Sequence, residues 1–298
     1  MEESMTMAAG VRFDGGIMLC AESMYSGGDA KFNRTKIFTT RYEGGCTIFA
    51  VAGHEGYAKL AVQDAQERIQ AEKGRRRTFK AIRSIVSTVV SSVYANHIDK
   101  RLPHELYDSE IQLLIAVRDE GEGLCLFATK KTAVIRIDTY DCIGSGASLG
   151  HYIIGPSYDA KLNERRVLML AIQALTATKD HDPYCGGDSE IIILREDGTI
   201  SPPRNAQSPL SLQFAETIIR EFNADSRRLL LALTDPATMD EARPQVDYFS
   251  SKMKYTREQW MAFIRQLETY GEKDPQSGGW KMHHPPDLTP PKEDNEAG

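Results

Sequence analysis

Apolar residues fall along the chain in short runs and in two periods, and these patterns predict the elements of the fold. Near the N-terminus, two apolar runs flank Asp14-Gly15-Gly16, where the glycine pair supplies the positive φ of a tight turn. Residues 6–23 are therefore predicted to form a β-hairpin. Residues 46–52 are apolar except for Thr47, a pattern typical of a strand buried on both faces, and a hairpin turn at 43–45 precedes them. Similar patterns predict strands at residues 35–40, 111–117, 124–129, 133–137 and 191–194.

Helical periodicity separates these groups of strands. Gly53 ends the preceding strand, and a stretch rich in Ala, Gln and Glu predicts a helix from there to about residue 72. Apolar residues also recur at helical spacing over 82–93 and 167–175. Another helix is predicted after the glycine-rich segment 144–150, whereas the polar segment 24–33 is predicted to be a loop. This order fits two sheets packed face to face with helices outside, which is an α+β fold.

Beyond residue 202 the pattern becomes helical. Helices are predicted over residues 210–222, over 227–233 and from 255 onward. At the start of the last one, Thr256 and Gln259 form a capping box. From Asp274 the chain is polar and proline-rich, which predicts a disordered tail over residues 274–298.

Composition narrows the function classes for this chain of 298 residues. The formal net charge of −6 argues against a nucleic-acid binder that works by neutralising phosphates, and no apolar run is long enough for a membrane span. The five cysteines are widely spaced without a C-x-x-C pair, which indicates reduced thiols and a cytoplasmic protein. The histidines do not form a ligand cluster with the cysteines, so no metal site is predicted. The spacing G-x-G-x-x-x-G at 144–150 does not fit a dinucleotide loop, so no cofactor is predicted.

The first hairpin places Thr6 unusually close to the chain start. A threonine at a free N-terminus can attack with its hydroxyl while its own α-amine takes the proton. From the hairpin alone, Thr6 could also be an ordinary β-branched residue of a strand.

Five motifs, in order, resemble those of the proteasome β-subunit family, the threonine-dependent branch of the N-terminal nucleophile hydrolases. The resemblance covers roughly residues 6 to 200. The motifs are Thr6 and Gly10 followed by D-G-x-x-x-L-x-A-E-S, then Thr35-Lys36-Ile37-Phe38, then the run 47–53 ending in A-G, then Ile143-Gly144-Ser145-Gly146, and last the segment 182–187 with the sequence D-P-Y-C-G-G. The resemblance implies a four-layer αββα sandwich of two antiparallel sheets, here with a C-terminal helical extension.

The same resemblance implies roles for five side chains. Thr6 would be the nucleophile and its free amine a general base. Glu22 would hold Lys36 by charge pairing, and the Lys36 cation would favour the deprotonated Thr6 hydroxyl. Ser145 and Asp182 would orient the terminal amine and an attacking water.

The oxyanion donor implied by the resemblance is the backbone N–H of Ala50. Three positions depart from the family pattern: the oxyanion position is usually glycine, Cys185 replaces a serine, and Met24 replaces a basic residue. Supporting positions implied by the turn motifs are Gly144, Gly146, Cys185, Gly186 and Gly187.

The sequence thus predicts a threonine-dependent amidohydrolase, a peptidase of proteasome type acting on a peptide or protein substrate. It is expected to self-associate into a ring or stacked homo-oligomer, with any unfoldase partner left open. Residues 1–5 are interpreted as a propeptide or untranslated leader, 6–205 as the catalytic domain and 206–273 as the helical extension. Cleavage of the Met5–Thr6 bond or initiation at Met5 would free Thr6. Two alternatives stay open: a catalytically silent proteasome-like scaffold, and a non-peptide amidase of the same superfamily.

Overall fold

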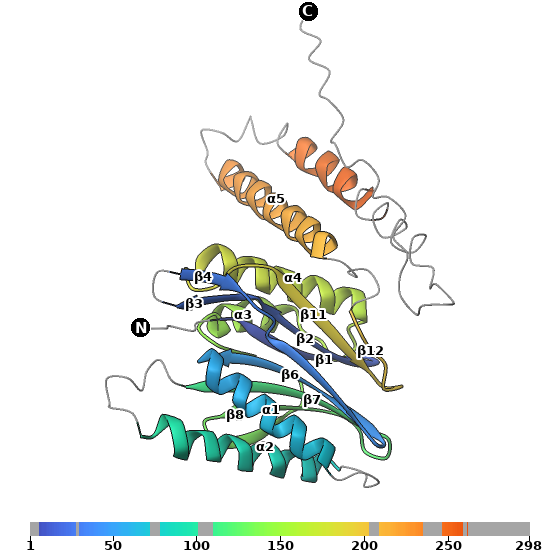
Figure 1. The fold of residues 1–298 in the computed structure, drawn as a ribbon. Helices are drawn as coiled ribbons and strands as arrows, with labels where there is room; N and C mark the ends of the chain where they lie inside the picture. The colour runs from blue at the N-terminus through green and yellow to red at the C-terminus, as the bar shows by residue number, and fades with distance from the viewer. Residues whose placement is uncertain are drawn as a thin grey trace, which may run out of the picture. The chain divides into compact units, whose positions relative to one another are not determined.

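The structure, a computed structural model, describes residues 6–27, 30–71, 78–100, 110–202, 209–234, 246–258 and 261. The chain divides into two compact units, Met1–Ala224 and Asp225–Gly298. The first unit contains both sheets and the helices that cover them (Figure 1). The predicted leader at residues 1–5 and the predicted tail at 274–298 lie outside the described residues.

The first sheet has five strands in the order β10-β1-β2-β11-β12 and is antiparallel throughout. Its strands are β1 (Ala8–Phe13), β2 (Gly16–Glu22), β10 (Tyr140–Ile143), β11 (Ser189–Arg195) and β12 (Ile200–Ser201). The hairpin of β1 and β2 turns at Gly15, whose φ of 95° is the left-handed value that the glycine pair predicted. The first strand therefore lies inside the sheet, with β10 on its other side.

The second sheet has the order β5-β6-β7-β8-β9 and is also antiparallel. Its strands are β5 (Ile37–Tyr42), β6 (Gly45–Gly53), β7 (Ile111–Asp119), β8 (Gly123–Lys130) and β9 (Ala133–Ile137). Each strand pairs with the next strand in the chain. Tight turns join β5 to β6, β7 to β8 and β8 to β9, whereas residues 54–110, which include two helices, lie between β6 and β7.

Helices cover the outer face of each sheet (Figure 1). Helices α1 (Glu55–Ala71) and α2 (Phe79–Val93) pack on the second sheet, while α3 (Ala147–Ile154) and α4 (Glu164–His181) pack on the first. The predicted four-layer αββα sandwich is confirmed. Among the described residues, no helix combines the length and the apolar character that a membrane crossing needs.

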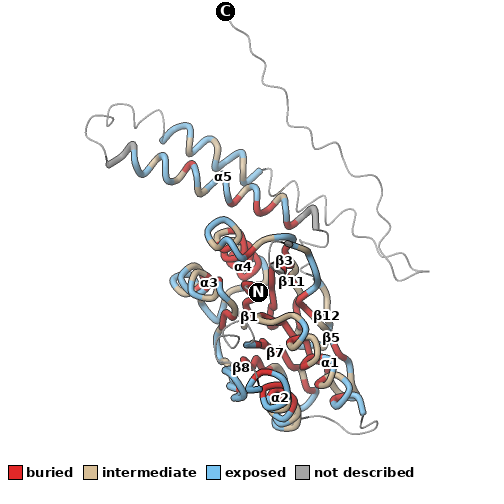
Figure 2. The backbone as a smooth tube through the Cα atoms, turned by 60° about the vertical axis from the view of Figure 1, so that its left-hand side comes forward, coloured by how far each residue is buried: buried red, intermediate tan, exposed pale blue. Residues whose placement is uncertain are grey.

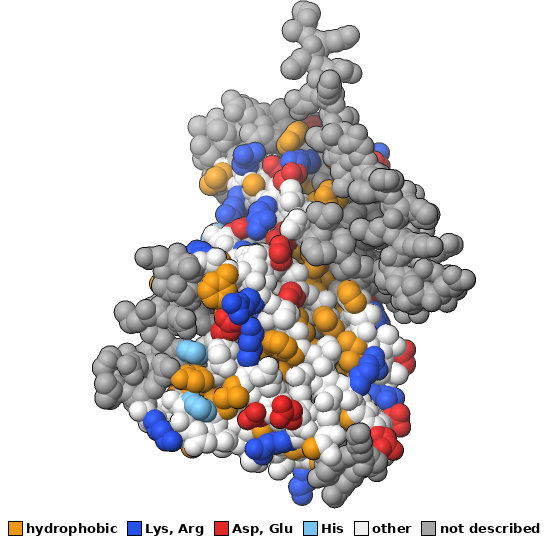
Figure 3. All heavy atoms as spheres, viewed as in Figure 1, with side chains coloured by type: hydrophobic (Ala, Val, Ile, Leu, Met, Phe, Trp, Pro, Cys, Tyr) orange, Lys and Arg blue, Asp and Glu red, His pale blue; other side chains and the backbone are white. Residues whose placement is uncertain are grey.

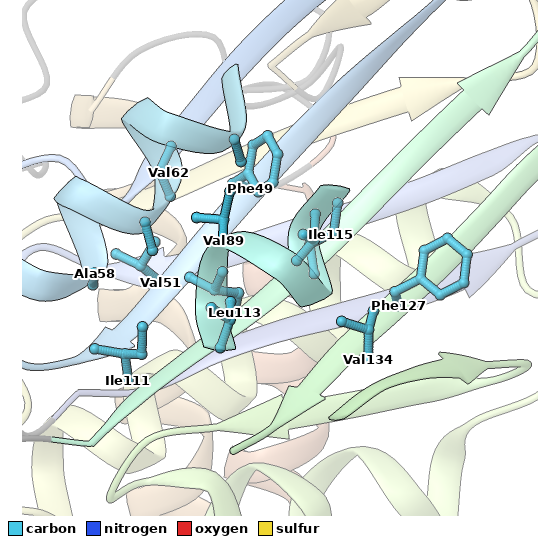
Figure 4. Close-up of a cluster of buried hydrophobic side chains, with 14 of the residues drawn as sticks. Phe49, Val51, Ala58, Val62, Val89, Ile111, Leu113, Ile115, Phe127 and Val134 are labelled. Atoms are coloured by element: carbon cyan, nitrogen blue, oxygen red, sulfur yellow. The ribbon is translucent and has the colours of Figure 1, made fainter. Parts of the chain in front are cut away.

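Two apolar clusters hold these layers together, and Figure 2 shows buried residues along the strands and on the inner faces of the helices. One lies between the second sheet and its helices, where Phe49, Val51 and Ile115 meet Val62 and Val89 (Figure 4). The other lies between the sheets and is rich in small side chains. Six of its fifteen buried residues are alanines, so small side chains fill much of the layer between the sheets.

The prediction of a loop over residues 24–33 is wrong. These residues form a separate hairpin of β3 (Met24–Gly27) and β4 (Ala30–Asn33). The aromatic rings of Tyr25 and Phe32 lie opposite each other in the register and stack with centroids 6.3 Å apart. This cross-strand pair stabilises strands whose polar composition resembles that of a loop.

Two predictions in the C-terminal region also need correction. The separate helices predicted at 210–222 and 227–233 are one helix, α5 (Pro209–Thr234), because the intervening residues include neither proline nor glycine. Residues 246–258 are already helical, so Thr256 lies within a helix and does not cap its start. The Ser/Thr-x-x-Glu/Gln pattern is short enough to occur inside helices as well as at their ends.

A buried ion pair joins the first half of α5 to α4. Lys179 Nζ lies 2.8 Å from Glu216 Oε1, and the two side chains are 7% and 6% exposed. The hydroxyl of Ser189 donates to the same carboxylate oxygen at 2.5 Å. Arg220 adds a more exposed bond, from Nε to the Asp180 carboxylate at 2.8 Å. Polar contacts therefore fix this part of α5 against the αββα unit.

Glu216→Ala is expected to lower the free energy of unfolding by about 3–5 kcal/mol, because the Lys179 ammonium stays buried without its counterion. Asp138→Ala is the control, since Asp138 pairs with Arg136 in an exposed ion pair and its loss should cost about 1 kcal/mol or less. Urea denaturation measures both. Equal small losses would show that the buried pair contributes no more than a surface pair.

Candidate active site

Thr6 precedes β1 and lies against the turn formed by residues 144–146. Its backbone carbonyl oxygen accepts the Gly146 N–H at 3.2 Å and the Ser145 hydroxyl at 3.5 Å. This continues the ladder between β1 and β10, in which Ala8 pairs with Ile143. Thr6 is completely buried. The predicted G-S-G turn thus fixes the main chain of the predicted nucleophile.

The side chain of Thr6 meets Lys36 and Glu22 in a cluster with no solvent exposure. Lys36 Nζ donates to Thr6 Oγ1 and to Glu22 Oε1, the latter at 2.7 Å. Its third acceptor is the carbonyl oxygen of Met24 at 2.5 Å. The Thr6 hydroxyl in turn donates to Glu22 Oε1. All three protons of an ammonium group are therefore satisfied.

Glu22, at the end of β2, is fixed by backbone donors as well. Its Oε1 accepts the Met7 N–H at 3.3 Å, and its Oε2 accepts those of Met24 at 2.8 Å and Gly186 at 3.0 Å. These backbone donors fix the orientation of the buried carboxylate. Met24, whose role the sequence did not indicate, thus contributes both backbone groups to the site.

Burial is the main influence on Lys36. It lowers the pKa of the ammonium below its ordinary value, and the Glu22 charge opposes this effect. The ammonium also lies 4.4 Å from the centre of the Tyr25 ring, a cation–π distance. The lysine is thus held by an anion, a carbonyl and an aromatic face at the hydroxyl of Thr6.

Ser145, Asp182 and Cys185 form a second group next to the first. The Ser145 hydroxyl donates to Asp182 Oδ2 at 2.8 Å, and the Cys185 thiol lies 3.4 Å from the same oxygen. Burial, followed by the charges of Glu22 and Asp182, raises the pKa of the Cys185 thiol, which stays neutral. Cysteine thus takes part in this hydrogen-bonded group at the position where the family pattern has serine.

Two of the supporting glycines have backbone conformations that favour glycine. Gly144 has φ of 90°, and a Cβ there would overlap the carbonyl oxygen of Thr6. Gly187 has φ of 73° with Asn33 and Ser23 in the way of a side chain. Gly146 faces Thr178 and Met7 closely, and Gly186 faces the Met24 side chain. The glycine motifs therefore permit close packing around Thr6 and Glu22.

Gly144→Ala is expected to destabilise the protein by more than about 4 kcal/mol, because the methyl group meets a fixed backbone oxygen in addition to the unfavourable φ. Gly123→Ala isolates the φ effect, since Gly123 has φ of 84° with open space around its Cβ position. That control should cost about 1–2 kcal/mol. Urea denaturation of both variants tests the difference, and equal losses would contradict the overlap.

The strand register bears on the predicted oxyanion donor. Val51 N–H donates to the Lys36 carbonyl at 3.1 Å, so the odd-numbered residues here direct their N–H groups toward β5. Ala50, opposite Leu114, directs its N–H into the ladder with β7. The register therefore argues against Ala50 as the donor. His54 donates its N–H to the Glu110 carbonyl, just before β7, so the alternation places the Gly53 N–H on the β5 side of β6, beyond the start of β5 at Ile37.

The structure adds residues that sequence reasoning missed. Gly53 had been assigned only to the end of a strand, although its A-G motif was among those quoted. Tyr25 and Glu190 contact Lys36 and had no assigned role. Glu190 could have been noticed as a charged residue at the start of a buried apolar strand. Nothing in the local pattern marked Tyr25.

On the face of the molecule in Figure 3, acidic and basic side chains are interspersed and no extended field of one sign is seen. Among the described residues, no group of histidine, cysteine and acidic side chains gathers in a way that could hold a metal ion.

A buried threonine before the first strand, a lysine and a carboxylate at its hydroxyl, and two antiparallel sheets between helix layers define the N-terminal nucleophile hydrolase class of fold. A model of the family described as "Proteasome subunit" matches residues 3–194. The chain belongs to the proteasome subunit family.

Curated relatives are distant. The chain is 24% identical over 199 residues to proteasome subunit beta 2 of Pyrobaculum neutrophilum, which covers 63% of this chain and 87% of that protein. It is 30% identical over 86 residues to proteasome subunit beta 2 of Pyrobaculum calidifontis, a match that spans 29% of this chain and 41% of that protein.

Solved structures show the same fold at lower identity. Anbu, the ancestral beta-subunit from Yersinia bercovieri, matches with a TM-score of 0.62 at 15% identity, over 74% of this chain and 96% of that one. The helical assembly of the Anbu complex from Pseudomonas aeruginosa has a TM-score of 0.62 at 14% identity, over 77% and 98%.

Proposed function

We propose that the protein is a threonine-dependent amidohydrolase, specifically a proteasome-like peptidase with Thr6 as its N-terminal nucleophile. The observation that carries this proposal is the buried contact of the Thr6 hydroxyl with Lys36 Nζ and Glu22 Oε1. A hydroxyl is a poor nucleophile at neutral pH, and a lysine with a carboxylate partner supplies positive charge at the oxygen. Family membership supports the same reaction class.

In the proposed reaction, Thr6 Oγ1 attacks the carbonyl carbon of the scissile amide. Its proton passes to the free α-amine of Thr6 and then to the leaving nitrogen, which departs as an amine. The Gly53 N–H stabilises the oxyanion, a role that needs only a backbone donor. Water then hydrolyses the Thr6 ester and restores the hydroxyl. Ser145 and Asp182 orient the terminal amine and this water.

This chemistry requires a free α-amine on Thr6, because an amide nitrogen is not basic. We therefore propose that residues 1–5 are absent from the working protein, through autocatalytic cleavage of the Met5–Thr6 bond or through initiation at Met5 with removal of that methionine. In the same proposal, residues 6–205 form the catalytic domain and 206–273 the helical extension, followed by the tail at 274–298.

Self-association into a ring or stacked oligomer is part of the proposal. A structurally similar Anbu chain was solved as a helical assembly. Closed or stacked assemblies shield a peptidase site from folded proteins. Light scattering at micromolar concentration should therefore show a homo-oligomer, and a monomer would contradict this part. We place this activity in the cytoplasm, consistent with five free cysteines in the structure.

The experiment is the intact N-terminal mass of the purified protein with and without a threonine-reactive β-lactone. The expected mass begins at Thr6 and increases by one inhibitor on treatment, whereas Thr6→Ala should not be modified. If every wild-type chain retains Met1, the mechanism fails and a silent scaffold takes its place. A peptide library then separates a peptidase from a non-peptide amidase.

A further inference from the structure

Glu190 lies on β11, in the first sheet, opposite Ala21 and thus one register position from Glu22. Its carboxylate does not take part in the group around Thr6. Instead, Oε2 accepts the backbone N–H of Lys36 at 2.8 Å, across the gap between the two sheets. The hydrogen bond of the glutamate is therefore to the main chain of the lysine.

Lys36 is anchored at both backbone groups, although it precedes β5 and lies outside the regular ladder. Its carbonyl oxygen accepts from Val51 of the second sheet at 3.1 Å, and its N–H donates to Glu190 of the first. The two anchors come from opposite sides and fix the direction in which the side chain leaves the main chain. That direction leads to Thr6.

The position of Lys36 depends on these anchors because the residue is completely buried. A buried N–H that loses its acceptor carries a full desolvation cost, so the segment would move to recover a partner. A lysine side chain has four rotatable bonds, and a small displacement of its Cα can separate Nζ from the Thr6 hydroxyl. Displacements of about 1 Å at a reacting group are costly for rate.

Glu190 also contributes charge. Within the part of the chain that the structure describes, four ionisable groups act on the ammonium of Lys36 or contact it, and they lie on β2, on β3, on β11 and in the segment before β11. They are Glu22, Tyr25, Glu190 and Cys185. The negative charge of Glu190 raises the pKa of Lys36 against the effect of burial. The carboxylate thus supports the protonated lysine as well as its backbone.

We propose that Glu190 is a positioning residue for Lys36, which holds the lysine main chain from the opposite sheet so that Nζ reaches Thr6. This inference rests on the proposed function for its effect on rate. The backbone anchor itself does not depend on that function. The two claims can therefore be tested apart.

The test uses the full chain as wild type, Glu190→Ala, Glu190→Gln and the control Glu196→Gln, which changes an exposed glutamate just after the same strand. Two measurements are made. Acylation of Thr6 by a β-lactone is followed by intact mass across pH on chains that have a free Thr6. Hydrogen exchange of the peptide containing Lys36 is followed on all chains.

Glu190→Ala should slow acylation and speed exchange at Lys36 by about tenfold or more, as expected for a lost hydrogen bond to a charged acceptor. In Glu190→Gln the amide oxygen still accepts the N–H, so exchange should stay near the wild-type rate. Without the charge, the pKa of Lys36 falls, and the alkaline limb of the acylation profile should move to lower pH. The Glu196→Gln control should match wild type in both measurements.

If Glu190→Ala is acylated at the wild-type rate and its Lys36 peptide exchanges at the wild-type rate, the inference is overturned. An unshifted alkaline limb in Glu190→Gln would overturn its charge component. If wild type itself is not acylated, the proposed function fails, and the exchange difference between the alanine and glutamine variants then decides the backbone anchor alone.

Discussion

Lys36→Ala is expected to reduce amide hydrolysis to background and also to destabilise the protein by about 3–5 kcal/mol. Activity is lost because no cation remains at the Thr6 hydroxyl. Stability is lost because the Glu22 carboxylate stays buried without its counterion. A surface lysine would show neither effect. Hydrolysis of a peptide library and urea denaturation measure the two losses separately.

Two further variants separate these causes. Lys31→Ala removes a nearby exposed lysine that donates to the Pro183 carbonyl, and it should leave both activity and stability within about 0.5 kcal/mol of wild type. In the double variant Glu22→Gln with Lys36→Met, neither of these two positions carries a buried charge, and the glutamine oxygen can still accept backbone donors. It should recover part of the lost stability while remaining inactive. Near-normal turnover in Lys36→Ala would rule out the proposed role.

Thr6→Ala is expected to lower hydrolysis by at least about 10³-fold, because the nucleophilic oxygen is removed while the surrounding donors remain. Thr6→Ser keeps a hydroxyl, now a primary one, and should retain measurable activity. Hydrolysis rates and intact masses of both variants give the comparison. Equal activity in the alanine variant and wild type would exclude covalent catalysis through this residue.

The N-terminal mass of Thr6→Ala also identifies how the nucleophile is freed. Under autocatalytic cleavage the variant should retain Met1 to Met5, because Thr6 itself attacks the preceding carbonyl. Under initiation at Met5 the five residues should be absent in the variant as well. The serine variant is the control for folding, since it should be processed in either case.

Much of the fold follows from local sequence. Glycine pairs fix the turns of the first hairpin and of the β5–β6 hairpin, where Gly15 and Gly44 have positive φ. Runs of apolar residues predicted the central strands, and apolar residues at helical spacing predicted α2. Turn chemistry and periodicity act over a few residues, so these elements were predictable. The errors at 24–33 and within α5 arose where a cross-strand aromatic pair or the absence of a helix breaker outweighed composition.

The motifs predicted which residues belong to the candidate site, but they did not predict how those residues contact one another. Lys36 is separated from Thr6 by 30 positions, and Asp182 from Ser145 by 37. Only the packing of two sheets brings these side chains together. The choice between Ala50 and Gly53 depends on which edge of β6 faces β5, a property of register that a single strand sequence does not specify.

The sequence by itself determined most of the strand and helix order, the first hairpin and the residue types of a threonine, lysine and carboxylate site. The tertiary structure alone decided that Lys36 is completely buried, that Met24 serves the site through its backbone, and that Glu190 holds the lysine from the opposite sheet. The physical reason is that hydrogen bonds and burial at this site join segments far apart in the chain, and their energies depend on positions that only the packed sheets fix.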